Sequence, residues 1–211
     1  MTTYLTSAYL APIQYYTKFV TYQKVVIEQN DHYVKQTYRN RCSIVSANGP
    51  ISLSIPVVHS SPEKTMTKDI RIAEHGNWQH MHWNAIISAY NSTPFFEFYK
   101  DDFHPFFHKK VNFLFDFNTE LHSLVLKLLN IDASDIIFTD SYKANFSDGK
   151  LDMREAIHPK KDWKIDSGFC PSPYYQVFEQ KFGFIENMSI IDLLFNMGNE
   201  SLIVLKNSIR R

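Results

Sequence analysis

Glycine is scarce in this sequence, with 6 residues in 211, whereas average usage of about 7% would give more than twice as many. The sequence contains no Gly-rich phosphate loop, no dinucleotide-binding fingerprint and no nucleophile elbow. Nucleotide-binding schemes in which a glycine backbone approaches the phosphates closely are therefore disfavoured. We expect any bound phosphate to be held by side chains or by a helix N-terminus.

Cysteine is also rare, and the two cysteines do not suggest a metal site. Cys42 and Cys170 form neither a metal-ligand spacing nor a disulfide framework. His104 and His108 stand four residues apart, as ligands on a helix can, but no third ligand accompanies them at a matching spacing. We predict no metal site, and the sequence points to no particular cofactor. Cys42 is expected to pack as a small apolar side chain rather than to act as a nucleophile.

An excess of one charge and a long hydrophobic run are both missing. The 22 basic and 22 acidic residues cancel, which argues against a general nucleic-acid-binding protein, because such proteins carry a basic excess. Nowhere do about 18 apolar residues follow one another, and the start of the chain lacks the basic region and apolar core of a signal peptide. We expect a cytoplasmic protein without membrane insertion or nucleic-acid partners.

The order of the predicted elements favours an α/β fold. A strand, a short helix over IQYYTKFVTY and the strand KVVIEQ make a β-α-β unit, and a β-hairpin follows, with Ile51, Leu53 and Ile55 alternating after an Asn48-Gly49 turn. We predict a mixed open sheet with a helix-rich second half, and α+β is the alternative. The chain is expected to form one domain, with a sheet-forming part at 1–75, a helical part at 76–135, a loop-rich part at 140–173 and C-terminal helices at 174–211.

Two helices are predicted in detail. One runs from Asn77, as its N-cap, to about Tyr90 and has an apolar stripe that faces the core. The other begins near Ser189, which forms a capping-box-like pair with Asp192, and ends at Gly198 as its C-cap. The stripe of the first helix comprises Trp78, Met81, His82, Ala85, Ile86, Ala89 and Tyr90.

Chemically versatile side chains are concentrated in EQNDHYVKQTYRNRC, between two apolar runs. Lys35 and Arg39 share one face whether this stretch is a helix or a strand, and Arg41 joins them in a strand. Two interpretations stay open. The stretch is either a solvated or internally paired basic face with Glu28 and Asp31 as partners, or an anion site in which Arg39 or Arg41 holds a phosphate or carboxylate bidentately and Lys35 adds a point charge.

Two further features also have two interpretations. His82 lies within the apolar stripe of its helix, where a histidine is usually a hydrogen-bonded core residue; the alternative is a general base. The polar segment from Ser141 to Pro173 is long enough to close over a substrate and exclude water, with Lys160 and Lys161 facing an anion. Alternatively, it is a solvated loop.

Several long motifs, in the right order, resemble the WbqC-like family. They are YLAPIQYYTKF, HYVKQTYRNRC, a hairpin ending in LSIPV, WQHMHWNAIISAYNSTPFFEFY and SIIDLLFNMG, and they span nearly the full chain. The resemblance implies an association with bacterial surface polysaccharide (O-antigen) gene clusters and a proposed transfer of glycine or another acyl group to a sugar. The family's motif positions here, none with an established catalytic role, are Tyr9, Pro12, His32, Tyr33, Lys35, Arg39, Asn40, Arg41, Trp78, His82, Tyr90 and Phe95.

We combine the residue chemistry and the resemblance into one hypothesis, an acyl or aminoacyl transferase that acts on a small anionic or sugar substrate. His82 would accept a proton from the attacking group, and Glu28, Asp31 and His32 are the other catalytic candidates. Where such families often carry an aspartate, this chain has Glu28 followed by Asp31. The predicted substrate-binding residues are Tyr9, Tyr33, Lys35, Arg39, Asn40, Arg41, Trp78 and Tyr90.

Two rival functions remain at this point. A non-catalytic accessory protein that binds a sugar or nucleotide would need the cations and aromatic rings but no base. A nucleotidyltransferase-like enzyme would use the α/β opening and would be stabilised by nucleoside triphosphate with magnesium.

Overall fold

The centre of the protein is a parallel β-sheet, seen in a computed structural model that describes residues 1–58, 65–132, 134, 136–146 and 149–210. β1 (Thr2–Thr6) and β2 (Lys24–Glu28) pair in parallel and are joined by α1 (Ile13–Thr21), which confirms the predicted β-α-β unit. β5 (Ile136–Phe138) pairs with β2, and β6 (Lys150–Asp152) pairs with β1. The order β5-β2-β1-β6 and the separate hairpin make this a mixed α/β fold, as predicted.

The sheet draws a strand from the segment that we expected to be loop-rich. β6 lies in the polar stretch between Ser141 and Pro173, where only a short 3₁₀ turn, η3 (Trp163–Ile165), follows it before the next helix. Its three residues are too few to show an alternating pattern. The sheet therefore extends beyond residues 1–75, and this segment contributes to the architecture of the protein.

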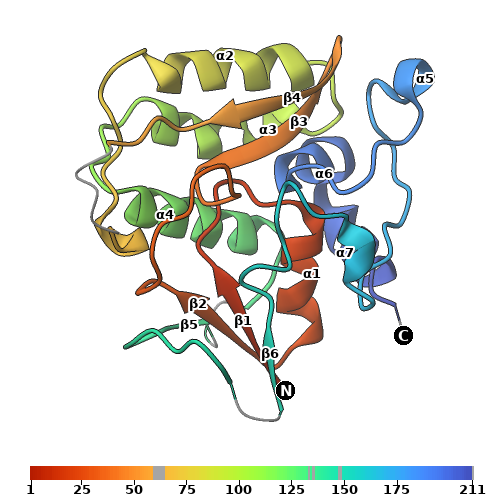
Figure 1. Ribbon diagram of the computed structural model, residues 1–211. Helices are drawn as coiled ribbons and strands as arrows, with labels where there is room; N and C mark the ends of the chain where they lie inside the picture. The colour runs from red at the N-terminus through yellow and green to blue at the C-terminus, as the bar shows by residue number, and fades with distance from the viewer. Residues whose placement is uncertain (59–64, 133, 135, 147–148, 211) are drawn as a thin grey trace.

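The predicted hairpin is confirmed. β3 (Arg41–Ser46) and β4 (Gly49–Ser54) pair antiparallel, and the loop is Ala47-Asn48, one residue earlier than predicted, with Gly49 opening β4 at φ 101°. Leu53 is buried, whereas the neighbouring serines of β4 are exposed. This alternation places the apolar face of the hairpin against α2 (Trp78–Tyr90) at the top of the molecule (Figure 1).

Helix α2 has the predicted bounds, but two details of its prediction were wrong. Met81 is 57% exposed, and Trp83 is buried in its place. Asn77 adopts a left-handed conformation at φ 45°, and its side chain makes no capping hydrogen bond. Trp83 packs against Phe107 with ring centroids 5.4 Å apart, so the buried face of α2 also contacts the aromatic segment that follows it.

The remaining helices surround the sheet and the hairpin. In Figure 1 the hairpin, α2 and α3 form the upper half, α4 crosses the middle, and α1, α6 and α7 line one side. No helix within the described residues is long and apolar enough to cross a membrane. The bounds are η1 (Thr67–Asp69), α3 (Phe96–Phe103), η2 (His104–Phe107), α4 (Leu114–Leu128), α5 (Glu179–Phe182), α6 (Ile190–Met197), η4 (Gly198–Glu200) and α7 (Ser201–Asn207).

The C-terminal helix α6 follows its prediction at one end only. The prediction of a capping box was wrong. The side chain of Ser189 makes no capping hydrogen bond, and its hydroxyl donates to the carbonyl of Leu10 at 2.7 Å. Asp192 is buried and accepts hydrogen bonds from Tyr90 at 2.9 Å and Tyr174 at 2.5 Å. Gly198 does end the helix, at φ 54°.

Substituting Gly198→Ala should destabilise the protein more than Gly183→Ala. Both glycines have positive φ in regions that alanine rarely adopts, which costs about 1–3 kcal/mol at each site. A Cβ at Gly198 would also collide with the ring of Phe95, whereas a Cβ at Gly183 meets nothing within 4 Å. We expect Gly198→Ala to lose a further 1–3 kcal/mol or so of unfolding free energy in urea denaturation. Equal losses for the two variants would contradict the packing of Phe95 on α6.

Candidate functional site

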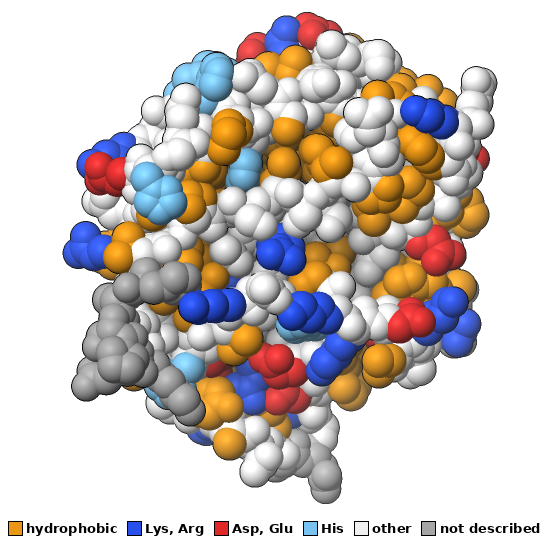
Figure 2. Space-filling view, turned by 45° about the horizontal axis from the view of Figure 1, so that its top comes forward, with side chains coloured by type: hydrophobic (Ala, Val, Ile, Leu, Met, Phe, Trp, Pro, Cys, Tyr) orange, Lys and Arg blue, Asp and Glu red, His pale blue; other side chains and the backbone are white. Residues whose placement is uncertain are grey.

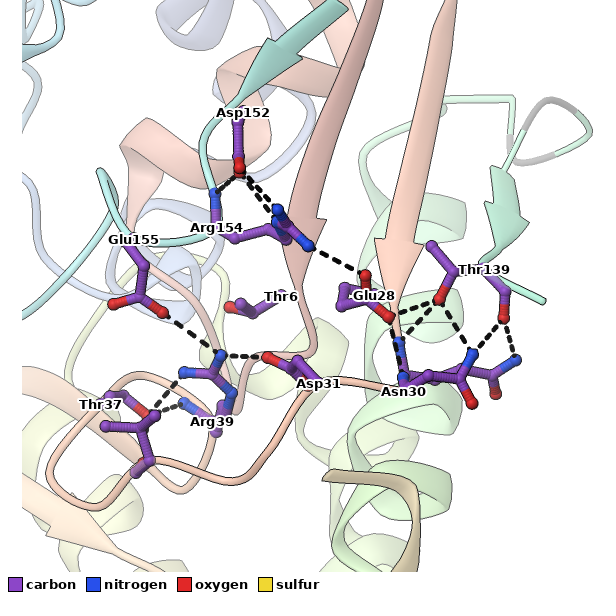
Figure 3. A network of polar contacts seen from close by, with 12 residues as sticks. Thr6, Glu28, Asn30, Asp31, Thr37, Arg39, Thr139, Asp152, Arg154 and Glu155 are labelled. Carbon is purple, nitrogen blue, oxygen red and sulfur yellow. Dashed lines mark hydrogen bonds and ion pairs between the residues drawn. The ribbon is translucent and has the colours of Figure 1, made fainter. Parts of the chain in front are cut away.

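The carboxyl ends of the four parallel strands meet at one edge of the sheet, where open α/β sheets usually bind ligands. Thr6 ends β1, Glu28 ends β2 and Asp152 ends β6, while Thr139 directly follows β5. Figure 3 shows these residues around the tips of the strands, where a network of polar contacts connects Glu28 with Thr139 and, through Arg154, with Asp152. This edge is the candidate functional site.

Glu28 is fully buried at this edge, with 0% of its surface exposed. Its Oε1 accepts hydrogen bonds from the hydroxyl of Thr139 at 2.6 Å and from the backbone N–H of Asn30 at 2.8 Å. Its Oε2 lies 3.1 Å from Nη1 of Arg154. Both carboxylate oxygens therefore have partners, and the negative charge is compensated by a cation that is itself buried.

Arg154 links the ends of β2 and β6. Its Nε and Nη2 donate to the two oxygens of Asp152 at 2.9 and 2.7 Å, a bidentate pairing. Its guanidinium also lies 4.7 Å from the ring centre of Phe146 and 5.1 Å from that of Tyr142. Burial raises the pKa of Asp152, but the hydrogen bonds from Arg154 outweigh this effect and hold it below its ordinary value.

A second buried ion pair lies beside the first (Figure 3). Arg39 pairs with Asp31 through Nη2, and Oε1 of Glu155 lies 3.6 Å from the same nitrogen. Arg39 is 2% exposed, and its Nη1 also donates to the hydroxyl of Thr37 at 3.4 Å. The arginine predicted to hold an anion therefore lies inside the protein and already has a carboxylate partner, which agrees with the internally paired interpretation for this residue.

The rest of the basic stretch is neither a helix nor a strand, the two geometries in which we expected Lys35 and Arg39 to share a face. Residues 29–40 form turns and bends with one isolated bridge, between His32 and Met66. Lys35 and His32 are exposed, and Nε of Arg41 donates to the hydroxyl of Ser54 at 3.1 Å. On the face seen in Figure 2, Lys and Arg side chains gather near the middle with acidic side chains among them.

Two other residues of the stretch have structural contacts. The side chain of Asn40 donates to the carbonyl of Ile55 at 2.8 Å, which ties the start of β3 to the end of the hairpin. Tyr33 is half-buried, and this burial raises its pKa to about 12, although the nearby Arg39 and Arg41 act in the opposite direction.

His82 lies in the core with two other predicted site residues. It is 5% exposed, its Nδ1 is 3.0 Å from the hydroxyl of Tyr9, and its ring centre is 5.2 Å from that of Trp78. Burial lowers the pKa of His82 to about 4, so the imidazole is neutral near pH 7, and a hydrogen bond with the backbone of Ser54 opposes this shift. These contacts agree with the hydrogen-bonded core interpretation.

Tyr90, the last residue of α2, is buried in the core as His82 is. Its hydroxyl donates to Asp192 at 2.9 Å and accepts the backbone N–H of Val45 at 3.2 Å. Burial raises the pKa of Tyr90. Burial also raises the pKa of the Asp192 carboxyl, because it outweighs three hydrogen bonds that act in the opposite direction. The tyrosine joins the hairpin to α6.

A pocket of about 270 Å³ runs along the sheet face that carries Tyr4 and Val26. The ring of Phe146 stacks on that of Tyr4 with centroids 3.8 Å apart, so the segment after β5 partly covers this face. Of the described residues that line this pocket, Glu28 is the only one that we predicted as a site residue. The pocket is lined by Thr2, Tyr4, Lys24, Val26, Glu28, Ile137, Phe138, Thr139, Asp140, Ser141, Lys143, Phe146 and Lys150.

The prediction missed several residues of the site, among them Thr139, Asp152, Arg154 and Glu155. These four residues lie at the end of β5 or β6 or just after it, and both strands are too short to show a periodic pattern. The nearby lysines of the expected lid have partners in the protein, since Lys160 contacts the side chain of Gln36 and Lys161 donates to the backbone of Glu155 at 2.7 Å.

The described residues contain no group of three His, Cys, Asp or Glu side chains placed to hold a metal ion. The rings of His104 and His108 stack with centroids 3.8 Å apart. Cys42 is buried, and this burial raises the pKa of its thiol, which makes it a poor nucleophile.

Comparison with known protein families shows that the WbqC-like protein family matches residues 7–162. The matched range contains the carboxyl edge of the sheet from Glu28 to Arg154, whereas the block SIIDLLFNMG lies outside it. No curated protein and no solved structure matches the chain.

The neutral, buried state of His82 predicts a loss of stability in acid. Its pKa is about 4 in the folded protein and about 6.5 when unfolded, so the stabilisation is complete above pH 6.5 and declines as the pH falls towards 4. From pH 7.5 to pH 5 this histidine should account for a loss of about 2 kcal/mol of unfolding free energy.

The measurement is urea unfolding at the two pH values for the wild type and for His82→Gln, which should lose about 2 kcal/mol less between them. His80→Gln is the matched control, because His80 lies exposed on the same helix. An unchanged pH dependence in His82→Gln would show that His82 is accessible to protons in the folded protein.

Proposed function

We propose that this chain, which belongs to the WbqC-like protein family, is a transferase of bacterial surface polysaccharide (O-antigen) biosynthesis that places glycine or another acyl group on a sugar. The biosynthetic role rests on the resemblance to that family. The observation that carries the choice of site is the pocket along the parallel sheet, which contains cations, stacked aromatic rings and carboxylates.

The dimensions of the pocket suit a sugar that carries an anionic group. Lys24 begins β2 and Glu28 ends it, so at about 3.3 Å per residue the two positions lie about 13 Å apart along the pocket. Lys143 and Lys150 add positive charge, which favours a phosphate or carboxylate. The stacked rings of Tyr4 and Phe146 offer an apolar surface for the body of the substrate.

In the transfer, the attacking hydroxyl or amine forms a bond to the acyl carbon while the donor's acyl bond breaks and releases the coenzyme A thiol or AMP, and a base takes the proton of the attacking group. His82 is buried in the core, and both oxygens of Glu28 already accept hydrogen bonds. Asp140, directly after Thr139, lines the same pocket and is exposed. We assign the proton transfer to Asp140 and a positioning role to Glu28, which holds Thr139 and Arg154 at the strand ends.

The second candidate function is a non-catalytic accessory protein that binds the sugar. The partners of Glu28 favour it, because Arg154, Thr139 and the backbone N–H of Asn30 already bond both oxygens of this buried carboxylate, which leaves neither oxygen facing a substrate. Such a protein would use the same lysines and rings but would give no product.

Isothermal titration calorimetry with UDP-glucose tests the binding part of the proposal. Lys143→Ala should weaken binding about fivefold, since one charge-assisted contact is lost. Lys127→Ala removes an exposed lysine on α4 outside the pocket and should leave affinity unchanged. Equal affinity for wild type, Lys143→Ala and Lys127→Ala would place the substrate elsewhere.

Mass spectrometry of UDP-glucose incubated with acetyl-coenzyme A or glycyl-adenylate tests the transfer. Asp140→Asn should keep its affinity for UDP-glucose and lose transfer about 100-fold, because only the base is removed. Binding without product in the wild-type protein supports the accessory function. Full transfer activity in Asp140→Asn contradicts the assignment of the base.

A further inference from the structure

Two basic segments that are far apart in the sequence lie side by side in the structure. Nζ of Lys160 contacts Oε1 of Gln36, 124 residues earlier in the chain. Oε1 of Glu155 lies 3.6 Å from Nη2 of Arg39, and Figure 3 shows Glu155 reaching this arginine from the segment that follows β6. The basic stretch and the segment 155–161 therefore form one surface, and none of its residues named here lines the pocket along the sheet.

The two lysines of this surface are held by neutral groups. Both are exposed, and Nζ of Lys161 donates to the backbone carbonyl of Glu155 at 2.7 Å, whereas Nζ of Lys160 contacts the amide oxygen of Gln36. Neither lysine forms an ion pair with a carboxylate of the described residues, and the carboxylate of Glu155 faces Arg39 instead. The two ammonium groups are therefore positioned, but no carboxylate compensates their charge.

His158 adds a hydrogen-bond donor next to the lysines. Its Nδ1 lies 3.0 Å from the backbone nitrogen of Lys160. A backbone N–H only donates, so Nδ1 must be the acceptor, and the proton of the neutral ring is on Nε2. Burial lowers the pKa of His158; Glu155 opposes this shift, and Lys161 and Lys160 add to it, so both lysines lie close to the ring.

Gln36 contributes a further donor from the basic stretch. An ammonium only donates, so the oxygen of Gln36 faces Lys160, and its amide nitrogen has no partner among the described residues. Gln36 is exposed and has φ 60°, a left-handed conformation that is unfavourable for its side chain and that is found most often at functional sites. Lys35, the preceding residue, is exposed and adds positive charge.

We propose that this surface is a binding site for a phosphate group, formed by Gln36, His158, Lys160 and Lys161. Each of these side chains offers a hydrogen-bond donor, and the terminal oxygens of a phosphate only accept. A phosphate monoester also carries nearly two negative charges near pH 7.5, which the two lysines would compensate. A carboxylate has one oxygen fewer and a single charge, so it fits the four donors less well.

Glucose, glucuronate and glucose 6-phosphate are matched probes, because they carry no charge, one negative charge and nearly two at the same end of one sugar. In ¹H–¹⁵N NMR titrations of the full chain, glucose 6-phosphate should shift the amide signals of residues 35–41 and 155–161. Glucuronate should bind about fivefold more weakly, and glucose should not bind at this surface.

Inorganic phosphate identifies the source of the group in the same titration. An affinity equal to that of glucose 6-phosphate would assign the site to the free ion, and a lower affinity would assign it to a phosphate ester. Either result supports the phosphate site, provided that the amide shifts lie at residues 35–41 and 155–161.

Charge substitutions test the individual contacts. Lys160→Gln should weaken the binding of glucose 6-phosphate about fivefold, because one charge-assisted hydrogen bond is lost. Lys127→Gln makes the same change in net charge at an exposed position on α4 and should leave the affinity unchanged. Glu155→Gln should strengthen binding about threefold, because it removes the acid nearest to the bound phosphate.

Three outcomes would overturn the proposal. They are equal binding of glucuronate and glucose 6-phosphate; wild-type affinity in Lys160→Gln; and amide shifts confined to the pocket along the sheet, with binding lost in Lys143→Ala. The site shares no residue with the pocket assigned to the transferase, so failure of the transfer reaction leaves this test intact.

Discussion

The burial of Glu28 at the end of β2, compensated by Arg154, is the constraint on which the arrangement of the sheet depends. A carboxylate with no exposed surface would cost several kcal/mol without a partner. Its partner comes from a segment 126 residues later in the chain and is oriented by Asp152 at the end of β6. The ion pair therefore fastens β6 to β1 and β2, and it places the segment with Tyr142 and Phe146 over one face of the sheet.

The two sides of the sheet offer different environments because different elements cover them. On one side, Lys24, Lys143 and Lys150 line an open pocket with the stacked pair Tyr4 and Phe146. On the other side, which carries Ile27, α4 closes a smaller and uncharged pocket with Asn118 and His122. Asn118 also bonds the carbonyl of Arg39, so this smaller pocket is connected to the buried ion pair of Arg39 and Asp31.

Sequence periodicity predicted the elements whose patterns are long enough to read. The β-α-β unit, the hairpin and α2 follow from apolar runs and alternation, and Gly198 follows from the need for a positive φ. β6 was missed because three residues carry no pattern. The pairing of Glu28 with Arg154 was missed because a long-range ion pair leaves no local signal, and the basic stretch was assigned a shared face that its turns and bends do not provide.

A double-mutant cycle between Glu28 and Arg154 tests most directly whether this ion pair holds the edge of the sheet together. Urea unfolding free energies are measured for the wild type, Glu28→Gln, Arg154→Met and the double variant. If the buried pair is the central constraint, the double variant loses less unfolding free energy than the two single variants lose together, and the difference is about 2 kcal/mol or more. Losses that add to within about 0.5 kcal/mol would show that the two side chains act independently and would contradict this account.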